Sequence, residues 1–265
     1  VDLKTVHLLK RSPAISVHSV NGNQHYTFAM RTDTAPFTDN NIRLALKHGL
    51  DREAMLQTIL RGYGAVGNDH PIGQGDQYFA AELEQRTYDP DKAKFHLREA
   101  GVDSLAVDLS VAEAAFAGAV DAGVLYAEHA AAAGIDISVV REPNDGYWSN
   151  VWLNKPWCAG YWGGRPTADL MFTTAYAAGA SWNDTFWDNE RFNELLVQAR
   201  AELDQPLRAE MYHEMQEIVR DDGGAVIPMF AAYVFATSDK VAHGEAFASN
   251  MDMDGHRCVE RWWFA

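Results

Sequence analysis

The chain has 265 residues, of which 47% are hydrophobic and 22% are charged. This length allows one large or two modest domains with a buried core, and the composition is typical of a globular chain. Acidic residues outnumber basic residues by 37 to 22, which gives a formal net charge of −15. Such a charge repels the phosphates of nucleic acids, and no apolar run approaches the ~20 residues of a membrane span. We therefore expect neither nucleic-acid binding nor membrane insertion by this chain.

Strand patterns lie toward both ends of the chain. Residues 15–20 and 25–31 flank Asn21-Gly22-Asn23. An Asn-Gly pair tolerates the positive φ angles of tight turns, so we predict a β-hairpin here. Near the other end, residues 225–229 and 233–237 again have the composition of strands.

Between these strands the sequence alternates helical and strand patterns. Asp39 and Asp51 are placed to cap two successive helices, and the glycine-rich residues 62–77 predict a loop. Strands that alternate with helices in βαβαβ order need crossover connections, which favour a parallel sheet. We therefore predict the α/β class, with a central, mainly parallel sheet flanked by helices. The predicted helices are residues 39–60 in two parts, 89–101, 116–133, 145–153, 189–203 and 206–221, and the predicted strands are 105–111, 135–140 and 157–162.

Three matches to known site motifs are incomplete. Residues 62–67 fit G-x-G-x-x-G, but a helix precedes them and a loop follows, whereas a dinucleotide site needs a strand before and a helix after. Residues 250–255 imitate the start of a calcium loop, whose twelfth position is here Arg261 instead of Glu. His213-Glu214 begins a zinc motif that lacks its second histidine. We therefore predict no cofactor, no metal site and no catalytic residue.

Aromatic residues concentrate between residues 147 and 187, which contain six of the eight tryptophans. Trp148 and Trp152 are one helical turn apart and suit a packed core. In contrast, Trp162 ends a predicted parallel strand before a glycine-rich loop, where open α/β sheets bind ligands. We predict a ligand pocket for a polar organic solute, lined by Trp162, Arg165, Asp169, Trp182 and Asn183.

Some of these residues have a simpler interpretation. Arg165 and Asp169 could belong to a surface ion pair, which contributes little to stability or binding. Asn183 could cap the turn that follows it.

A series of short motifs extends over almost the whole chain. Residues 36–46 read PFTDNNIRLAL, and LDREA follows at residues 50–54. Further motifs follow at residues 145–148, 162–169, 182–183, 192–196, 208–216 and 227–228. In this order they resemble family 5 extracellular solute-binding proteins, which are the dipeptide, oligopeptide and nickel type of ABC-transporter receptors.

The resemblance implies a fold of two lobes joined by crossing strands, with the ligand trapped between the lobes. This sequence then corresponds to a periplasmic binding protein type II-like lobe. Residues 1–29 are expected to form crossing or first-lobe strands, residues 30–228 the second lobe, and residues 229–265 the return strands and the C-terminal tail of the first lobe. Most of the first lobe has no counterpart in the sequence, so we expect the chain to be a fragment.

The implied function is that of the substrate-binding component of an ABC importer for a peptide-like or other polar organic solute. Such a receptor is a monomer, acts with ABC permease subunits, and lies in the periplasm or is lipid-anchored outside the cytoplasmic membrane. It performs no chemistry. Alternatives are an enzyme that uses Asp169 or another carboxylate in the same pocket, and the sensor domain of a regulator.

Two departures from the family bear on the ligand. Peptide receptors of the family carry an aspartate after a Trp-containing strand, where it neutralises the α-ammonium group, but residues 161–164 include no acidic side chain. This argues against a peptide with a free amine. Residues 157–200 contain no histidine, which argues against a metal chelate.

Cys158 and Cys258 are too few for a zinc site or a multi-bridge scaffold, but they can form one disulfide. Because the resemblance implies export to an oxidising compartment, we predict that they pair and pin the C-terminal tail to a sheet strand. The alternative is two unrelated buried thiols.

Overall fold

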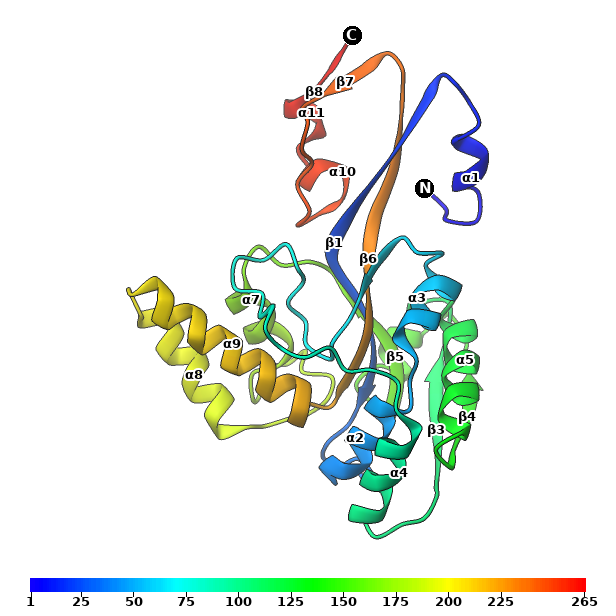
Figure 1. Ribbon diagram of the computed structural model, residues 1–265, viewed down its shortest axis with the longest axis vertical. Helices are drawn as coiled ribbons and strands as arrows, with labels where there is room; N and C mark the ends of the chain where they lie inside the picture. Colours follow the sequence, from blue (N-terminus) through cyan, green and yellow to red (C-terminus); the bar gives the residue numbers. More distant parts are fainter.

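Two long antiparallel strands, β1 (Ile15–Met30) and β6 (Ala225–Ser238), run through most of the molecule (Figure 1). The computed structural model describes residues 1–265. The inner halves of both strands belong to a six-stranded sheet with the order β2-β6-β1-β5-β3-β4. In their outer halves, residues 15–21 and 232–238 pair with each other and extend beyond the sheet. We call this two-stranded extension the ribbon.

The sheet is mixed. Its other strands are β2 (Gly64–Val66), β3 (Leu105–Val111), β4 (Ile135–Arg141) and β5 (Trp157–Trp162). Strands β5, β3 and β4 are parallel, whereas β1 runs antiparallel to both β5 and β6. The predicted α/β class is confirmed, but the parallel part of the sheet is smaller than predicted, because the two long strands are inserted beside it in alternating directions.

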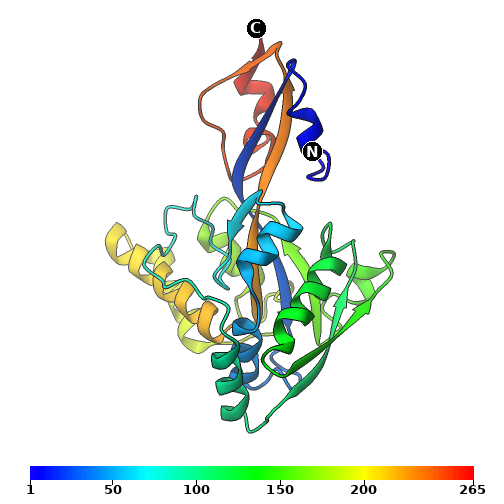
Figure 2. The ribbon, with the colours of Figure 1, turned by 45° about the vertical axis from the view of Figure 1, so that its right-hand side comes forward.

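Helices cover both faces of the sheet (Figure 2). On one face lie α2 (Asn40–His48), α3 (Arg52–Ile59), α4 (Pro90–Glu99) and α5 (Ala119–Ala131), which contribute Leu46, Met55, Leu97 and Tyr126 to a buried apolar core. On the other lie α7 (Ala168–Ala175), α8 (Glu190–Ala201) and α9 (Gln205–Asp222), which contribute Phe172, Phe192 and Met215 to a second core. None of the helices is both long enough and apolar enough to span a lipid bilayer.

Local sequence explains where several helices begin. The carboxylates of Asp39 and Asp51 accept hydrogen bonds from the backbone N–H groups of Asn41 and Ala54, which confirms the two predicted caps. The predicted helix at residues 145–153 is only the single turn α6 (Tyr147–Asn150), and α7 lies in a segment for which we predicted no helix.

The predicted hairpin at residues 15–31 is wrong, because residues 15–30 form one continuous strand. The pairing of β1 with β6 shifts register between Asn21 and His25, so the Asn-Gly pair lies at a β-bulge instead of a turn. Gly22 is required there by close approach. A Cβ atom at this position would lie 2.3 Å from Cε2 of the Tyr233 ring on β6.

Both chain termini lie beside the ribbon (Figure 2), and Leu3 near the N-terminus also packs against the apolar core of the sheet. The N-terminal segment contains α1 (Val6–Leu9). After the ribbon, β7 (Val241–His243) pairs with β8 (Trp262–Phe264), and the short helices α10 (Asp252–Gly255) and α11 (Cys258–Arg261) lie between them in sequence.

The predicted disulfide is wrong, since both cysteines are free. Cys158 is buried on β5 in the middle of the sheet, where it pairs with Ala29 of β1 on one side and with Ser110 of β3 on the other. Cys258 is on α11, in the segment that accompanies the ribbon. The two thiols therefore belong to different parts of the molecule.

Candidate ligand-binding site

An open groove with a volume of about 500 Å³ lies at the carboxyl end of β5. Five of the seven residues that line it are aromatic. We call it the aromatic groove, and its lining consists of Trp148, Trp152, Tyr161, Trp162, Gly163, Arg165 and Trp182. Its position agrees with the rule that open α/β sheets bind ligands where their strands end.

The rings of the aromatic groove form a continuous series. Ring centroids are 5.5 Å apart for Trp148 and Tyr161, 6.4 Å for Trp152 and Trp162, and 6.2 Å for Trp162 and Trp182. Trp162 is buried, whereas Trp148, Tyr161 and Trp182 have exposed fractions of 41%, 44% and 50%. Contiguous aromatic surface of this kind is uncommon on a soluble protein and is typical of a binding site.

A buried carboxylate lies behind the indole rings. Oδ2 of Asp184 accepts a hydrogen bond of 3.0 Å from Nε1 of Trp152. Burial raises the pKa of Asp184 to about 6, although hydrogen bonds from Trp152 and Trp162 act in the opposite direction. Asp184 therefore fixes the orientation of the indole rings from behind, and it does not line the groove itself.

Arg165 is the only charged residue in the lining of the aromatic groove. Its Nη1 donates to the carbonyl oxygens of Gly163 (3.1 Å) and Gly164 (3.3 Å), so the side chain folds back over its own loop. The guanidinium carbon lies 5.8 Å from the centroid of the Trp162 ring, within the range of a cation–π contact. The groove thus combines aromatic surface with one positive charge.

Three of the five predicted site residues meet in the groove, namely Trp162, Arg165 and Trp182. The other two lie elsewhere. The carboxylate of Asp169 on α7 accepts a hydrogen bond of 2.7 Å from Nε of Arg200.

Asn183 is buried within its own turn. Its Nδ2 donates to the carbonyl oxygens of Ala177 (3.2 Å) and Trp187 (2.8 Å), and its Oδ1 accepts from Thr185 (2.9 Å). These bonds use the Asn183 amide to shape the turn that places Trp182 and Asp184.

Sequence reasoning missed Trp148, Trp152, Tyr161 and Asp184 as parts of the site. The spacing of Trp148 and Trp152 indicated a packed helix face, but α6 ends after one turn and both rings reach the groove. Tyr161 was missed because alternate residues of a strand point to opposite faces and Trp162 had been placed in the pocket, whereas both residues line the groove at the end of β5.

The groove offers binding contacts and little chemistry. No group of three or more His, Cys, Asp or Glu side chains could hold a metal ion. Two carboxylates close in sequence to groove residues are each engaged, Asp169 by Arg200 and Asp184 by Trp152. Stacking, apolar contact and one cation are what the groove presents to a ligand.

Comparison with known proteins places this chain in a family. Residues 1–184 match the family model for bacterial extracellular solute-binding proteins, family 5, middle region. The dipeptide-binding protein of Escherichia coli (strain K12) is 24% identical over 234 residues, which cover 83% of this chain and 42% of that protein. The chain therefore spans less than half the length of this relative.

Solved structures share the fold. The periplasmic binding protein DppA from Helicobacter pylori, in complex with the peptide STSA, aligns with a TM-score of 0.84 and 20% identity, covering 99% of this chain and 51% of that one. NikZ from Campylobacter jejuni, in complex with Ni(L-His), aligns with a TM-score of 0.83 and 16% identity, covering 98% and 56% of the two chains. Because the family model matches more than half of the residues, the chain belongs to family 5 of the bacterial extracellular solute-binding proteins.

Proposed function

We propose that this chain is part of the substrate-binding component of an ABC importer and that it holds a peptide-like or other polar organic solute in the aromatic groove. The observation that carries the proposal is the groove itself, which is an exposed aromatic surface with one cation at the carboxyl end of a sheet strand. The E. coli relative is a dipeptide-binding protein, and the H. pylori structure contains a peptide. Both support a solute of this class.

The groove favours particular features of the solute. Arg165 is complementary to a carboxylate, and the indole faces suit flat or apolar groups. No acidic side chain lines the groove, so a free ammonium group would find no counter-charge there. We therefore propose a solute with a carboxylate and a flat or apolar body, and without a free amine in contact with this lobe.

Capture between two lobes is part of the proposal. The ribbon leads out of the sheet as a pair of strands, which supports residues 1–29 and 229–265 as connections to a first lobe and residues 30–228 as the second lobe. Closure of the first lobe over the open groove would desolvate the solute. Such a receptor would act as a monomer, in the periplasm or lipid-anchored outside the cytoplasmic membrane, and deliver solute to ABC permease subunits.

The proposal excludes turnover of the solute. Neither Asp169 nor Asp184 is free to act on a molecule in the groove, since each accepts a hydrogen bond and neither lines the groove. Mass spectrometry of the solute recovered from the intact receptor tests this directly. We expect one solute of unchanged mass after prolonged incubation with the receptor, and the appearance of a product would contradict the proposal in favour of an enzyme.

A further inference from the structure

The rings of the aromatic groove line it from different directions. The ring planes meet at 76° for Trp148 and Tyr161, at 75° for Trp148 and Trp152, and at 65° for Trp152 and Trp162. Rings set at such angles do not form one flat wall, so they can contact a compact, rounded group on several sides. The faces of tryptophan and tyrosine rings attract cations, and tryptophan does so most strongly. The groove therefore has the surface that a small organic cation requires.

The carboxylate of Asp184 adds a buried negative charge behind these rings. Its side-chain hydrogen bonds come from the indoles of Trp152 and Trp162, and no cation pairs with it. At pH 8, above the pKa of Asp184, which burial raises to about 6, the group is ionised. An unpaired charge in a low-dielectric interior acts over a longer distance than one in water. Its potential attracts positive charge to the groove, although Asp184 does not itself line the groove.

The lining limits which kind of cation fits. A primary ammonium group has three N–H donors, and it loses its hydration unless acceptors replace the water. No carboxylate lines the groove, and the carbonyl oxygen of Gly163 already accepts from Arg165. An N-methylated ammonium group needs contact with aromatic faces in place of hydrogen bonds. The groove therefore suits methylated nitrogen better than a free amine.

We propose that the solute held in the aromatic groove carries an N-methylated ammonium group together with its carboxylate. The methyl groups contact the exposed rings of Trp148, Tyr161 and Trp182, and the carboxylate lies toward Arg165, which itself approaches the Trp162 ring. This inference rests on the proposed function and narrows the apolar part of the solute to a group that bears a positive charge.

Trimethylglycine and 3,3-dimethylbutanoate are matched probes of this inference. They share a shape and a carboxylate, and they differ in the charge of one central atom. Each gives a single proton signal from three equivalent methyl groups, so saturation-transfer difference NMR measures both in the same way. We would titrate each probe at pH 8 into the intact receptor from which bound solute has been removed. We expect a Kd on the order of 1 mM for trimethylglycine and about tenfold weaker binding of 3,3-dimethylbutanoate. Glycine, which has a free ammonium group, should not displace trimethylglycine at similar concentrations.

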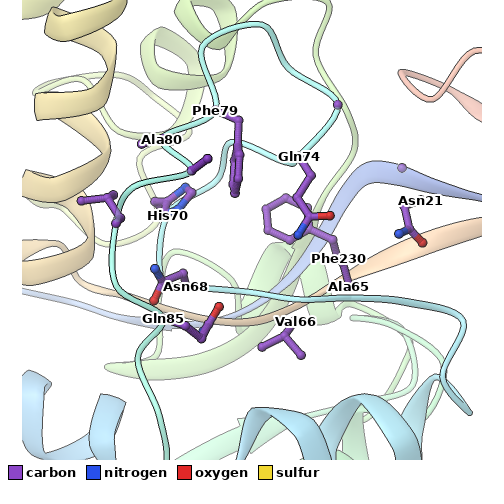
Figure 3. A pocket seen from close by; sticks show the side chains of 14 residues that line it. Asn21, Ala65, Val66, Asn68, His70, Gln74, Phe79, Ala80, Gln85 and Phe230 are labelled. Atoms are coloured by element: carbon purple, nitrogen blue, oxygen red, sulfur yellow. The ribbon is translucent and has the colours of Figure 1, made fainter.

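Two variants test the source of the preference. Asp184→Asn removes the buried charge and keeps an oxygen that can accept from Nε1 of Trp152. This variant should weaken the binding of trimethylglycine about three- to tenfold and should not weaken that of 3,3-dimethylbutanoate. A merely structural role of Asp184 would instead weaken both probes alike. Phe79→Ala is the control, because it removes a ring from a separate cavity of about 220 Å³ that shares no lining residue with the groove (Figure 3). It should bind both probes with the Kd of the wild type.

The outcomes separate this inference from the proposed function. Equal or tighter binding of 3,3-dimethylbutanoate, displacement by glycine at similar concentrations, or equal losses of both probes in Asp184→Asn would overturn the inference. Binding of neither probe would overturn it as well. The proposed function fails by a different result, namely that the recovered solute occupies another site in the intact receptor.

Discussion

Trp182 is the most exposed ring of the aromatic groove, so its removal is the simplest perturbation of the proposed site. A tryptophan buries about 150–250 Å² when fully covered. With half of its surface exposed, Trp182 offers roughly 100 Å² to a ligand. At about 25 cal/mol per Å², a solute that covers half to all of this area gains about 1.3–2.5 kcal/mol. Trp182→Ala should therefore raise the Kd about 10- to 70-fold.

Isothermal titration calorimetry with the recovered solute measures this change, using intact receptor from which bound solute has been removed by reversible unfolding. Trp263→Ala is the matched control, because Trp263 on β8 has a similar exposed fraction of 56% and lies outside the groove. We expect the control to bind with the Kd of the wild type. The reasoning would be refuted by an unchanged Kd for Trp182→Ala, or by equal losses in both variants.

Three further predictions concern stability, each measured by urea unfolding. The folded-state pKa of Asp184 is raised to about 6, so the stability that its protonation contributes is fully present below the unfolded pKa near 4 and is lost as the pH rises through 6. Relative to Asp184→Asn, the free energy of unfolding of the wild type should fall by on the order of 3 kcal/mol across this window. A difference between the two proteins that does not depend on pH would contradict this prediction. Asp69→Asn should lower the free energy of unfolding by about 3–5 kcal/mol, because it leaves buried arginines unpaired. Asp33→Asn, which breaks a partly exposed ion pair, should lower it by less than about 1 kcal/mol. Similar losses in the two variants would argue against the buried network. Gly22→Ala should lower the free energy of unfolding by about 1–3 kcal/mol, because the new Cβ atom meets a tyrosine ring. Gly244→Ala should be nearly neutral, because the space around this glycine is open. Equal effects of the two substitutions would argue against the close approach at Gly22.

Local patterns were sufficient to predict much of the fold. The strands at residues 105–111 and 157–162 have the predicted bounds, and Asp39 and Asp51 cap helices as expected. These features depend on neighbours within a few residues, which the sequence displays directly. The α/β class follows from the same alternation of elements.

Features that depend on distant residues were not predictable in this way. The Asn-Gly pair indicated a site of unusual backbone, but whether it forms a turn or a bulge depends on Tyr233, more than two hundred residues away. The direction of β1 beside β5 likewise decides how much of the sheet is parallel. The disulfide was inferred from composition and compartment, and neither reports the distance between Cys158 and Cys258.

In the candidate site, too, some features follow from neighbours in the sequence and others depend on how distant segments pack. The position of Trp162 at the end of a strand was enough to locate the groove, and Arg165 lies in the loop that follows. Trp182 could be assigned to the site from the loop sequence beside it. The buried position of Asp184 behind Trp152 could not be predicted, since it depends on how two loops pack.

The most direct test of the central proposal is a crystal structure of the intact receptor with its recovered solute bound. We expect the solute to lie in the aromatic groove, with a flat or apolar group against Trp162 and Trp182 and a carboxylate toward Arg165. A solute bound elsewhere, with the groove left to solvent, would contradict the proposed function.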